Sequence, residues 1–342
     1  MAGSRKRKDS SGAGDAKRPG ASSKKKAKVI KRQSSKPTSY NLEGISNDNE
    51  GLRIVTWNVN GLKGVLDQHE DLLIDYVKRE DPDIMCIQET KVQVDNKKEL
   101  QQRMEELVSG YHYTWNCCST KKGYAGTLIM AKVEPLSITC DDVVGSEGRL
   151  IVAEYAKAYI VTTYVPNSGL KLDRLRYRTE EWDLKMREKL DALKQMKPVI
   201  WCGDLNVAHG DEDVADWKKK RNKSPGFCDG ERENFGLIVG GDGEEISDEQ
   251  RKKRTLPLGR PGPAAGMGFV DAWREFQKDS EGYTFWSYRF QGRPKNNGWR
   301  LDYFVVSKEF LDNVMNCTRR NEMWGPSDHI PLVLNLKKGS LF

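Results

Sequence analysis

The 342-residue chain contains 57 Lys and Arg against 50 Asp and Glu, and its pI is near 8.9. Residues 1–40 carry a net charge of +11 and the remainder −4, so the remainder can bind a polyanion only through a local basic patch. Seven cysteines without a CxxC pair argue against a disulfide framework and a zinc site. Because neither a membrane-length apolar run nor a signal-peptide core occurs, we expect a soluble intracellular protein without membrane contact.

Residues 1–50 are expected to form a disordered basic tail, because Lys, Arg, Ser, Gly and Ala offer little to bury. Basic clusters at residues 5–8 and 24–28 are typical of nuclear import signals, which predicts an import receptor as partner and a nuclear location. A polyanion-binding arm or a solubilising tail are the alternatives. The cytoplasm and mitochondria remain alternative locations.

Residues 51–342 alternate short β-rich runs with helical stretches, which predicts a single domain of the α/β or layered α+β class. An apolar face through Trp182, Met186 and Leu190 predicts one helix. A second helix is expected to end near Asp81 and Pro82. The predicted strands span residues 53–57, 84–88, 127–131, 150–155, 159–164, 199–202, 303–307 and 332–336.

Residues 241–268 hold six glycines, three prolines and a charged run, so we expect a mobile insertion there. The chain shows no internal repeat and no second linker, and we expect a monomer.

Polar side chains cluster where the predicted apolar strands end, and the loops of a layered sheet protein build a common cleft at such ends. Their carboxylates and amides are ligands suited to Mg²⁺ or Mn²⁺. Neither a P-loop nor a GxSxG turn is present. The groups are Asn58 and Asn60 in WNVNG, Glu89 in IQET, Tyr164 and Asn167 in TYVPN, Asp204, Asn206 and His209 in CGDLNVAH, Asp302 in GWRLDYF, and Asp328 with His329 in SDHIP.

Together, the phrases WNVNGL, QETK, YVPN, GDLNVAH, GWRLDYF and SDH resemble those of the exonuclease III family of abasic-site endonucleases, within the deoxyribonuclease I-like phosphodiesterases. The resemblance spans residues 52–336, apart from the insertion. It implies a four-layer sandwich of two central mixed β-sheets flanked by helices, with a cleft at one end. It also implies incision of duplex DNA 5′ to an abasic site, leaving 3′-OH and 5′-deoxyribose phosphate, with 3′-phosphodiesterase and 3′–5′ exonuclease as related activities.

The resemblance also implies roles for five catalytic residues. Asp204 matches the residue that activates the attacking water, and Asn206 the one that holds the phosphate or that water. His329 paired with Asp302 would present a positively polarised imidazole to a phosphoryl oxygen. Tyr164 would help to neutralise the phosphate. Tyr164 and a metal-bound water are alternatives for protonating the leaving oxygen.

Glu89 matches the principal metal-binding carboxylate of the family. Asn60 stands where some relatives have aspartate, and Asp328 lies in the matching SDH motif. Asn58 is expected to orient Glu89 or the metal water. The complete expected metal set is Glu89, Asn60, Asp328, Asp204 and Asn206.

Phe285, Trp299 and Leu301 match the family's apolar pocket for a base-free deoxyribose, which would accept a flipped abasic sugar and reject a normal nucleotide.

The expected phosphate contacts are Asn167, Arg174, Arg289 and Lys121, with Lys122 and Arg178 as further candidates. Relatives carry arginine and methionine at the positions of Leu170 and Arg289, so the grip on DNA should differ here. A phosphodiesterase for other phosphate esters and a non-catalytic nucleic-acid binder are the alternative functions.

Overall fold

The computed structural model describes residues 36–37, 39–45, 51–140, 143–240, 266–278 and 281–342. The basic clusters expected to act as import signals and residues 241–265 of the insertion lie outside the described residues. Within the described part, no helix combines the length and apolar character required to cross a bilayer.

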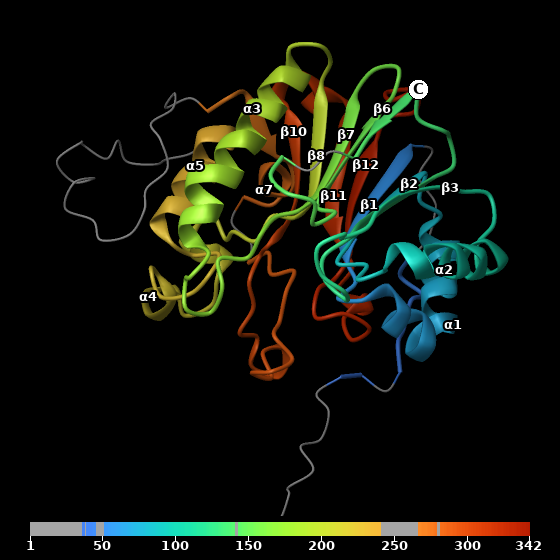
Figure 1. The fold of residues 1–342 in the computed structure, drawn as a ribbon, viewed down its shortest axis with the longest axis horizontal. Helices are drawn as coiled ribbons and strands as arrows, with labels where there is room; N and C mark the ends of the chain where they lie inside the picture. Colours follow the sequence, from blue (N-terminus) through green and yellow to red (C-terminus); the bar gives the residue numbers. More distant parts are fainter. Residues whose placement is uncertain (1–35, 38, 46–50, 141–142, 241–265, 279–280) are drawn as a thin grey trace, which may run out of the picture. The chain divides into compact units, whose positions relative to one another are not determined.

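Two six-stranded sheets form the centre of the fold, as Figure 1 shows. Parallel pairing joins β1 to β2 and β7 to β8, and the other pairs are antiparallel, so both sheets are mixed. The first sheet has the order β11 (Val314–Arg319), β12 (Leu332–Leu336), β1 (Leu52–Asn58), β2 (Ile84–Gln88), β4 (Thr127–Ala131) and β3 (His112–Asn116). The second has the order β5 (Ser137–Thr139), β6 (Leu150–Glu154), β7 (Tyr159–Tyr164), β8 (Val199–Asp204), β10 (Asp302–Ser307) and β9 (Phe269–Asp271).

Helices cover the outer face of each sheet (Figure 1). The longer ones are α1 (Leu62–Glu80) and α2 (Val94–Leu107) on the first sheet, and α3 (Asp183–Lys194) and α5 (Asp229–Val239) on the second. A π-helix, η1 (Tyr177–Trp182), precedes α3. The short helices are α4 (Trp217–Lys220), α7 (Ala272–Phe276), η2 (Asp211–Asp213), η3 (Arg293–Lys295), η4 (Lys308–Asn313) and η5 (Asn321–Met323).

Strand residues that alternate in direction create three apolar layers. Ile54 of β1 packs between the sheets with Ile160 and Ile200 of the second sheet. Its neighbour Val55 faces α1 and α2, whereas Val161 of β7 faces α3 and α5. The predicted four-layer sandwich with two mixed sheets is therefore confirmed.

The eight predicted strands occur within two residues of their expected bounds, and both predicted helices form. Four strands were not predicted: β3, β5, β9 and β11. Their half-exposed or very short sequences carry no continuous apolar run. Upstream of residue 51, Leu42 and Ile45 are buried in the layer between the first sheet and its helices, so packed chain begins before the expected end of the tail.

Candidate active site

Polar residues from both sheets meet at one end of the sandwich. The register pairs Asp204, the last residue of β8, with both Tyr164 of β7 and Asp302 of β10. Asn58 ends β1 opposite Gln88 of β2, which directly precedes Glu89. The strand ends thus bring together groups that lie far apart in the chain, such as Asn58 and Asp204, which are 146 residues apart.

Asn58 links the carboxylates of the two sheets. Its fully buried side-chain amide donates to Glu89 Oε1 at 3.0 Å and to Asp204 Oδ2 at 2.8 Å. Its own Oδ1 accepts from the main-chain N–H of Asn60 at 2.9 Å. Ser327 Oγ donates to the Asn58 carbonyl at 2.6 Å. Every hydrogen-bonding atom of the Asn58 side chain is used, so the amide fixes both carboxylates against each other.

His329 forms a buried pair with Asp302. The Nδ1 atom lies 2.8 Å from Asp302 Oδ2, which also accepts from Thr284 Oγ1 at 2.6 Å. Its Nε2 atom lies 3.8 Å from Asp204 Oδ2. Burial lowers the pKa of His329, but the charges of Asp302 and Asp204 outweigh it and raise that pKa to about 10. The ring is therefore a cation at neutral pH, with Nε2 turned toward the cleft carboxylate.

Asp204 lies at the centre of the site. Burial raises its pKa to about 7, with the charges of Asp302 and Glu89 adding to the effect and His329 opposing it. Asn206 donates its main-chain N–H to Asp204 Oδ1 at 3.0 Å, and Asn167 Nδ2 donates to Asn206 Oδ1 at 2.9 Å. A carboxyl group that changes charge near neutral pH is suited to accept a proton from water.

The oxygens of Glu89, Asn60 and Asp328 form the candidate metal position. Asn60 Nδ2 donates to Asp328 Oδ1 at 2.9 Å. The ammonium of Lys91 lies 3.0 Å from Glu89 Oε2 and donates to Asn60 Oδ1. Burial would raise the pKa of Glu89, but Lys91 and the Asn58 amide hold it below its usual range. These oxygens already bind one cation, the ammonium, and their chemistry fits a hard divalent ion.

A second acidic cluster, Asp204, Asp302 and His329, offers ligand atoms within 4.8 Å of one another. His329 cannot serve as a ligand there while it is protonated, because an imidazolium has no free nitrogen lone pair. Geometry and charge therefore favour the oxygens of Glu89 and Asp328, rather than the second cluster, as the metal position.

Three site residues adopt left-handed backbone conformations although none is glycine. The φ angles are 51° at Asn60, 50° at Glu89 and 48° at Asn206. Such conformations cost free energy and persist where the surrounding structure holds them. Each lies directly after a buried strand or two residues beyond it, so the turn redirects the side chain into the cleft.

Tyr164 lies between Glu89 and a buried arginine. Burial raises the pKa of Tyr164 well above its ordinary value, and the negative charge of Glu89 raises it further. Arg149 stacks 4.6 Å from the centre of the Tyr164 ring and donates to the Tyr164 carbonyl at 2.9 Å. The phenol therefore keeps its proton at neutral pH and is a hydrogen-bond donor.

Tyr124 connects two arginines beside Tyr164. Its hydroxyl accepts from Arg149 Nη2 and from Arg174 Nη1, each at 2.7 Å. Exposed Lys121 lies 4.8 Å from the Tyr124 ring centre. Arg174 and Lys121 thus both contact Tyr124 beside Tyr164, while Tyr124 and Arg149 were not identified from the sequence. Their signal was a tyrosine within KKGYAG and an arginine directly before the apolar strand β6.

Two of the three residues predicted for the sugar pocket lie together, and one of them is beside His329. Phe285 and Trp299 exchange main-chain hydrogen bonds at 2.9 Å, and the Phe285 ring centre lies 4.7 Å from that of His329. Leu301 is buried, whereas Phe285 and Trp299 are partly exposed. Phe227, which the sequence did not suggest, meets Trp299 edge-on at 6.4 Å.

Two candidates lie elsewhere than expected. Arg178 is buried, with Nε 2.5 Å from Asp183 Oδ1, so it is not a surface phosphate contact. Its remaining N–H groups donate to the carbonyls of Pro166, Leu205 and Asn206. His209 packs edge-on against Phe235 at 5.2 Å, away from the carboxylates, and burial lowers its pKa.

Asn167, Leu170, Arg289 and Lys122 are exposed, as groups that meet a ligand from solution must be.

The comparisons with known proteins identify the family of the chain. The Endonuclease/Exonuclease/phosphatase family profile matches residues 55–329. A DNA-(apurinic or apyrimidinic site) endonuclease of Dictyostelium discoideum is 38% identical over 85% of this chain and 72% of that protein. An exodeoxyribonuclease of Bacillus subtilis is 37% identical over 83% of this chain and 100% of that protein.

Among solved structures, an AP endonuclease from Leishmania major has a TM-score of 0.67 and 31% identity, covering 84% of this chain and 87% of its own. The range of the family profile, residues 55–329, includes every motif of the cleft. By its sequence and its fold, the chain belongs to the endonuclease/exonuclease/phosphatase family, and the predicted resemblance to its abasic-site endonucleases is confirmed.

Proposed function

We propose that this protein is a DNA-repair endonuclease that hydrolyses the phosphodiester bond 5′ to an abasic site in duplex DNA, leaving 3′-OH and 5′-deoxyribose phosphate. One observation carries the proposal: the cationic His329 touches both the central carboxylate and the apolar pocket. Its Nε2 lies 3.8 Å from Asp204, and its ring contacts Phe285. A reacting phosphate and a base-free sugar therefore fit side by side.

In the proposed reaction, Asp204 removes a proton from the attacking water. Its pKa of about 7 leaves a substantial fraction ionised at neutral pH. The imidazolium of His329 and the amide of Asn206 neutralise the phosphoryl oxygens as negative charge grows on them. Asp302 and Thr284 hold the imidazole in place. Tyr164, which retains its proton, donates to the same phosphate.

We assign the divalent cation to Glu89, Asn60 and Asp328, with Asp204 and Asn206 at the edge of the site, and Asn58 as the residue that orients Glu89. Mg²⁺ is the proposed ion, with Mn²⁺ as a substitute, because the donors are all oxygens. When bound, the ion supplies charge neutralisation to the phosphate and the departing oxygen. Lys91 would then move away from Glu89, since both cations compete for the same oxygens.

Selection of the abasic site is proposed to occur in the pocket of Phe285, Trp299 and Leu301. A sugar without its base exposes an apolar face that fits this wall, whereas an intact nucleotide brings a base that needs additional room. Asn167, Arg174, Arg289 and Lys121 would contact the DNA backbone. The same cleft would also accept damaged 3′ termini, because 3′-phosphodiesterase and 3′–5′ exonuclease reactions share this chemistry. We further propose that the monomer enters the nucleus through its basic tail.

Single-turnover incision of a labelled abasic duplex tests this function. Asp204→Asn keeps the side-chain shape but removes the base, so incision should fall by about 10²-fold to 10⁴-fold while DNA binding survives. Glu89→Gln weakens the metal position instead, so added Mg²⁺ should restore part of its rate. Asp216→Asn, at an exposed aspartate outside the site, is the matched control.

Three substrates separate the competing functions: abasic duplex, intact duplex and an inositol phosphate, each with Mg²⁺ or EDTA. Preference for the inositol phosphate would assign the cleft to small esters. Binding without cleavage of any substrate would identify a nucleic-acid binder. Near-normal single-turnover incision by Asp204→Asn would contradict the proposed role of the carboxylate.

A further inference from the structure

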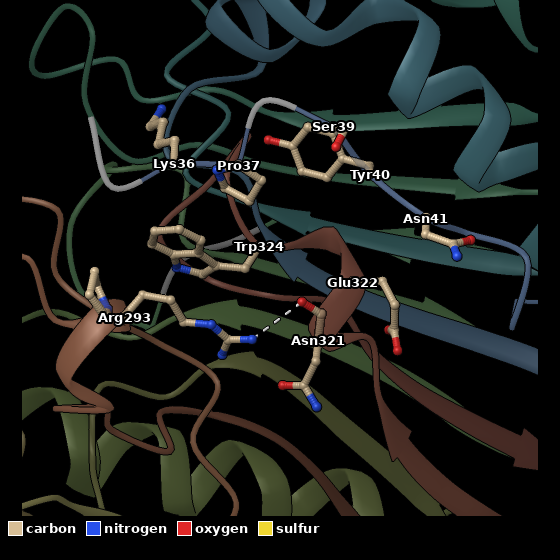
Figure 2. A pocket seen from close by; sticks show the side chains of 10 residues that line it. Lys36, Pro37, Ser39, Tyr40, Asn41, Arg293, Asn321, Glu322 and Trp324 are labelled. Atoms are coloured by element: carbon tan, nitrogen blue, oxygen red, sulfur yellow. Dashed lines mark hydrogen bonds between the residues drawn. The ribbon is translucent and has the colours of Figure 1, made fainter. Parts of the chain in front are cut away.

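A cavity of about 390 Å³, whose lining side chains Figure 2 shows, includes none of the residues assigned to the proposed active site. The residues that matter to its chemistry are Lys36, Tyr40, Asn41, Arg293, Glu322 and Trp324. Two contacts connect the cavity with Asp328 of the cleft. The charge of Asp328 acts on Lys36. The main-chain N–H of Trp286, whose ring lies against Arg293, donates to the Asp328 carbonyl at 2.9 Å. No role in the proposed reaction accounts for it.

Two hydrogen-bonding groups at this cavity lack partners. Trp324 is 3% exposed, and its indole Nε1 finds no acceptor among the described residues. The buried Tyr40 hydroxyl, on the opposite wall, has none there either. In Figure 2 the nitrogen of Trp324 lies on the side of its ring turned toward Arg293. Because a buried donor without an acceptor is costly, both groups favour a ligand rich in acceptors.

Arg293 supplies a cation to the same space. Its guanidinium stacks 3.9 Å from the centre of Trp286 and 5.8 Å from that of Trp324. Its polar contact is a long hydrogen bond of 3.5 Å to the Asn321 carbonyl, and no carboxylate of the described chain pairs with it within 4.0 Å. Burial lowers its pKa, which the charge of Glu322 partly opposes.

The residues that line the cavity carry a net positive charge. They include Lys36 and Arg293 against the carboxylate of exposed Glu322, while Asp328, which is not part of the lining, acts on Lys36. The Lys36 ammonium lies 4.3 Å from the centre of the Tyr288 ring. The Asn41 Oδ1 atom accepts from the Glu43 N–H, which leaves its amide N–H₂ as a further donor. Donors and cations together describe an anion site rather than a cation or apolar site.

We propose that this cavity is a second phosphate-binding site, in which the Arg293 guanidinium, the Trp324 indole N–H and the Tyr40 hydroxyl donate to one phosphate group. A planar guanidinium held flat against a tryptophan presents its N–H groups edgewise, which is the geometry that phosphate oxygens accept. The volume exceeds that of a phosphate alone and leaves room for an attached sugar.

The phosphate belongs to the DNA strand beyond the incision point, an assignment that rests on the proposed function. The loop that carries Arg293 also carries Phe285 of the sugar pocket and exposed Arg289. A strand anchored at the cleft would therefore continue along this loop toward the cavity. A free nucleotide or inorganic phosphate offers the same chemistry and is the alternative source.

Indole N–H signals in a ¹⁵N correlation spectrum test the site directly. The chain has nine tryptophans, and the signal that disappears in Trp324→Phe identifies the indole of interest. That signal should shift when inorganic phosphate is added without divalent metal. Trp182→Phe locates the matched control, another buried indole without a described acceptor, whose signal should stay in place.

Variants then measure the contribution of each donor to phosphate Kd. Tyr40→Phe removes the hydroxyl and keeps the ring, and Trp324→Phe replaces the indole with a smaller aromatic ring that has no N–H, so each should weaken phosphate binding by about tenfold. Arg293→Gln should weaken it at least as much and lower the salt dependence of binding to undamaged duplex by about one ionic contact. Far-UV circular dichroism checks that Arg293→Gln is folded.

The results separate the two proposals. A Trp324 signal that stays still in phosphate up to the solubility limit, with unchanged Kd in the variants, overturns the phosphate site. A shift with phosphate but not with duplex supports the site and rejects the strand as its source. If the wild-type protein does not incise an abasic duplex, the proposed function is overturned but the phosphate site is not, because the phosphate titration involves neither metal nor cleavage.

Discussion

Substitution of Arg178 distinguishes a buried support from a DNA contact. The side chain is 3% exposed and holds the carbonyls of Pro166, Leu205 and Asn206 as well as the Asp183 carboxylate. Removing one partner of a buried ion pair costs about 3–5 kcal/mol. Asp183 also accepts from Asn234 Nδ2 at 3.1 Å, which favours the lower half of that range.

We therefore expect Arg178→Ala to lose about 3–4 kcal/mol of unfolding free energy, or roughly 6 °C or more in Tm. The loop with Asp204 and Asn206 should shift, and single-turnover incision should fall by about 10²-fold at saturating DNA. Arg178→Lys keeps the charge but not the several N–H donors of the guanidinium, so its losses of stability and of incision rate should be smaller than those of Arg178→Ala.

Urea unfolding and single-turnover incision measure these effects. Arg176→Ala is the control. Arg176 is 79% exposed, directly precedes the π-helix and pairs only with Glu180 among the described residues, so its effect should stay within about 0.5 kcal/mol. Equal stability of the Arg176 and Arg178 variants, together with weaker DNA binding and a lower salt slope for the latter, would refute the supporting role.

Three further outcomes follow from other contacts. The charges of Arg300 and Arg274 outweigh burial and lower the pKa of Asp213 from 3.8 to about 2. The ionised carboxylate therefore stabilises the folded protein fully above its unfolded pKa, and this stabilisation is lost as pH falls through about 2. Asp213→Asn should thus unfold in less urea at pH 7 and lose less stability on acidification. Asn60→Asp places a carboxylate beside Asp328, so the metal-free protein should have a lower Tm. Mg²⁺ should raise that Tm more than in wild type, and incision should reach half its maximal rate at a lower Mg²⁺ concentration. Mg²⁺ titrations of the variant and the wild type that superimpose would contradict this. Arg289→Ala should weaken binding to abasic duplex more than to single strands, as fluorescence anisotropy can determine, whereas equal losses would reduce Arg289 to a generic phosphate contact.

Most of the fold could be predicted because its inner strands are continuous apolar runs. The strand at Ile84–Gln88 is buried at every position and was predicted with its observed bounds. By contrast, β11 alternates buried and exposed residues, and β5 has only three residues, so neither differs from a loop in composition. Pairing with a neighbouring strand makes them strands, and pairing partners are distant in the sequence.

The sequence could predict which residues gather at the candidate site, because their positions follow from where the central strands end. Asn58, Glu89, Asp204 and His329 converge because each lies at an end of a central strand or directly beside one. The contacts between them could not be predicted, since they depend on side-chain directions across two sheets. Arg178 shows the limit most clearly, because a basic residue between charged neighbours gives no sign that it will be buried.

Residues of the supporting network were missed for a related reason. Lys91 stands within the QETK motif, yet only the structure brings its ammonium between Glu89 and Asn60. Arg149 and Tyr124 belong to segments without an apolar or catalytic pattern, and their importance comes from long-range contacts with Tyr164 and Arg174.

The hydrogen bond from Asn58 to Asp204 joins a residue of β1 in the first sheet to a residue of β8 in the second. Neither sheet alone holds all the groups needed to cleave DNA, so a chain in which only one sheet has formed has no working site. Cutting ability would then appear in the last stage of folding, when the sheets close on each other. In a cell, this arrangement would spare DNA from nicks by half-folded copies during synthesis or degradation.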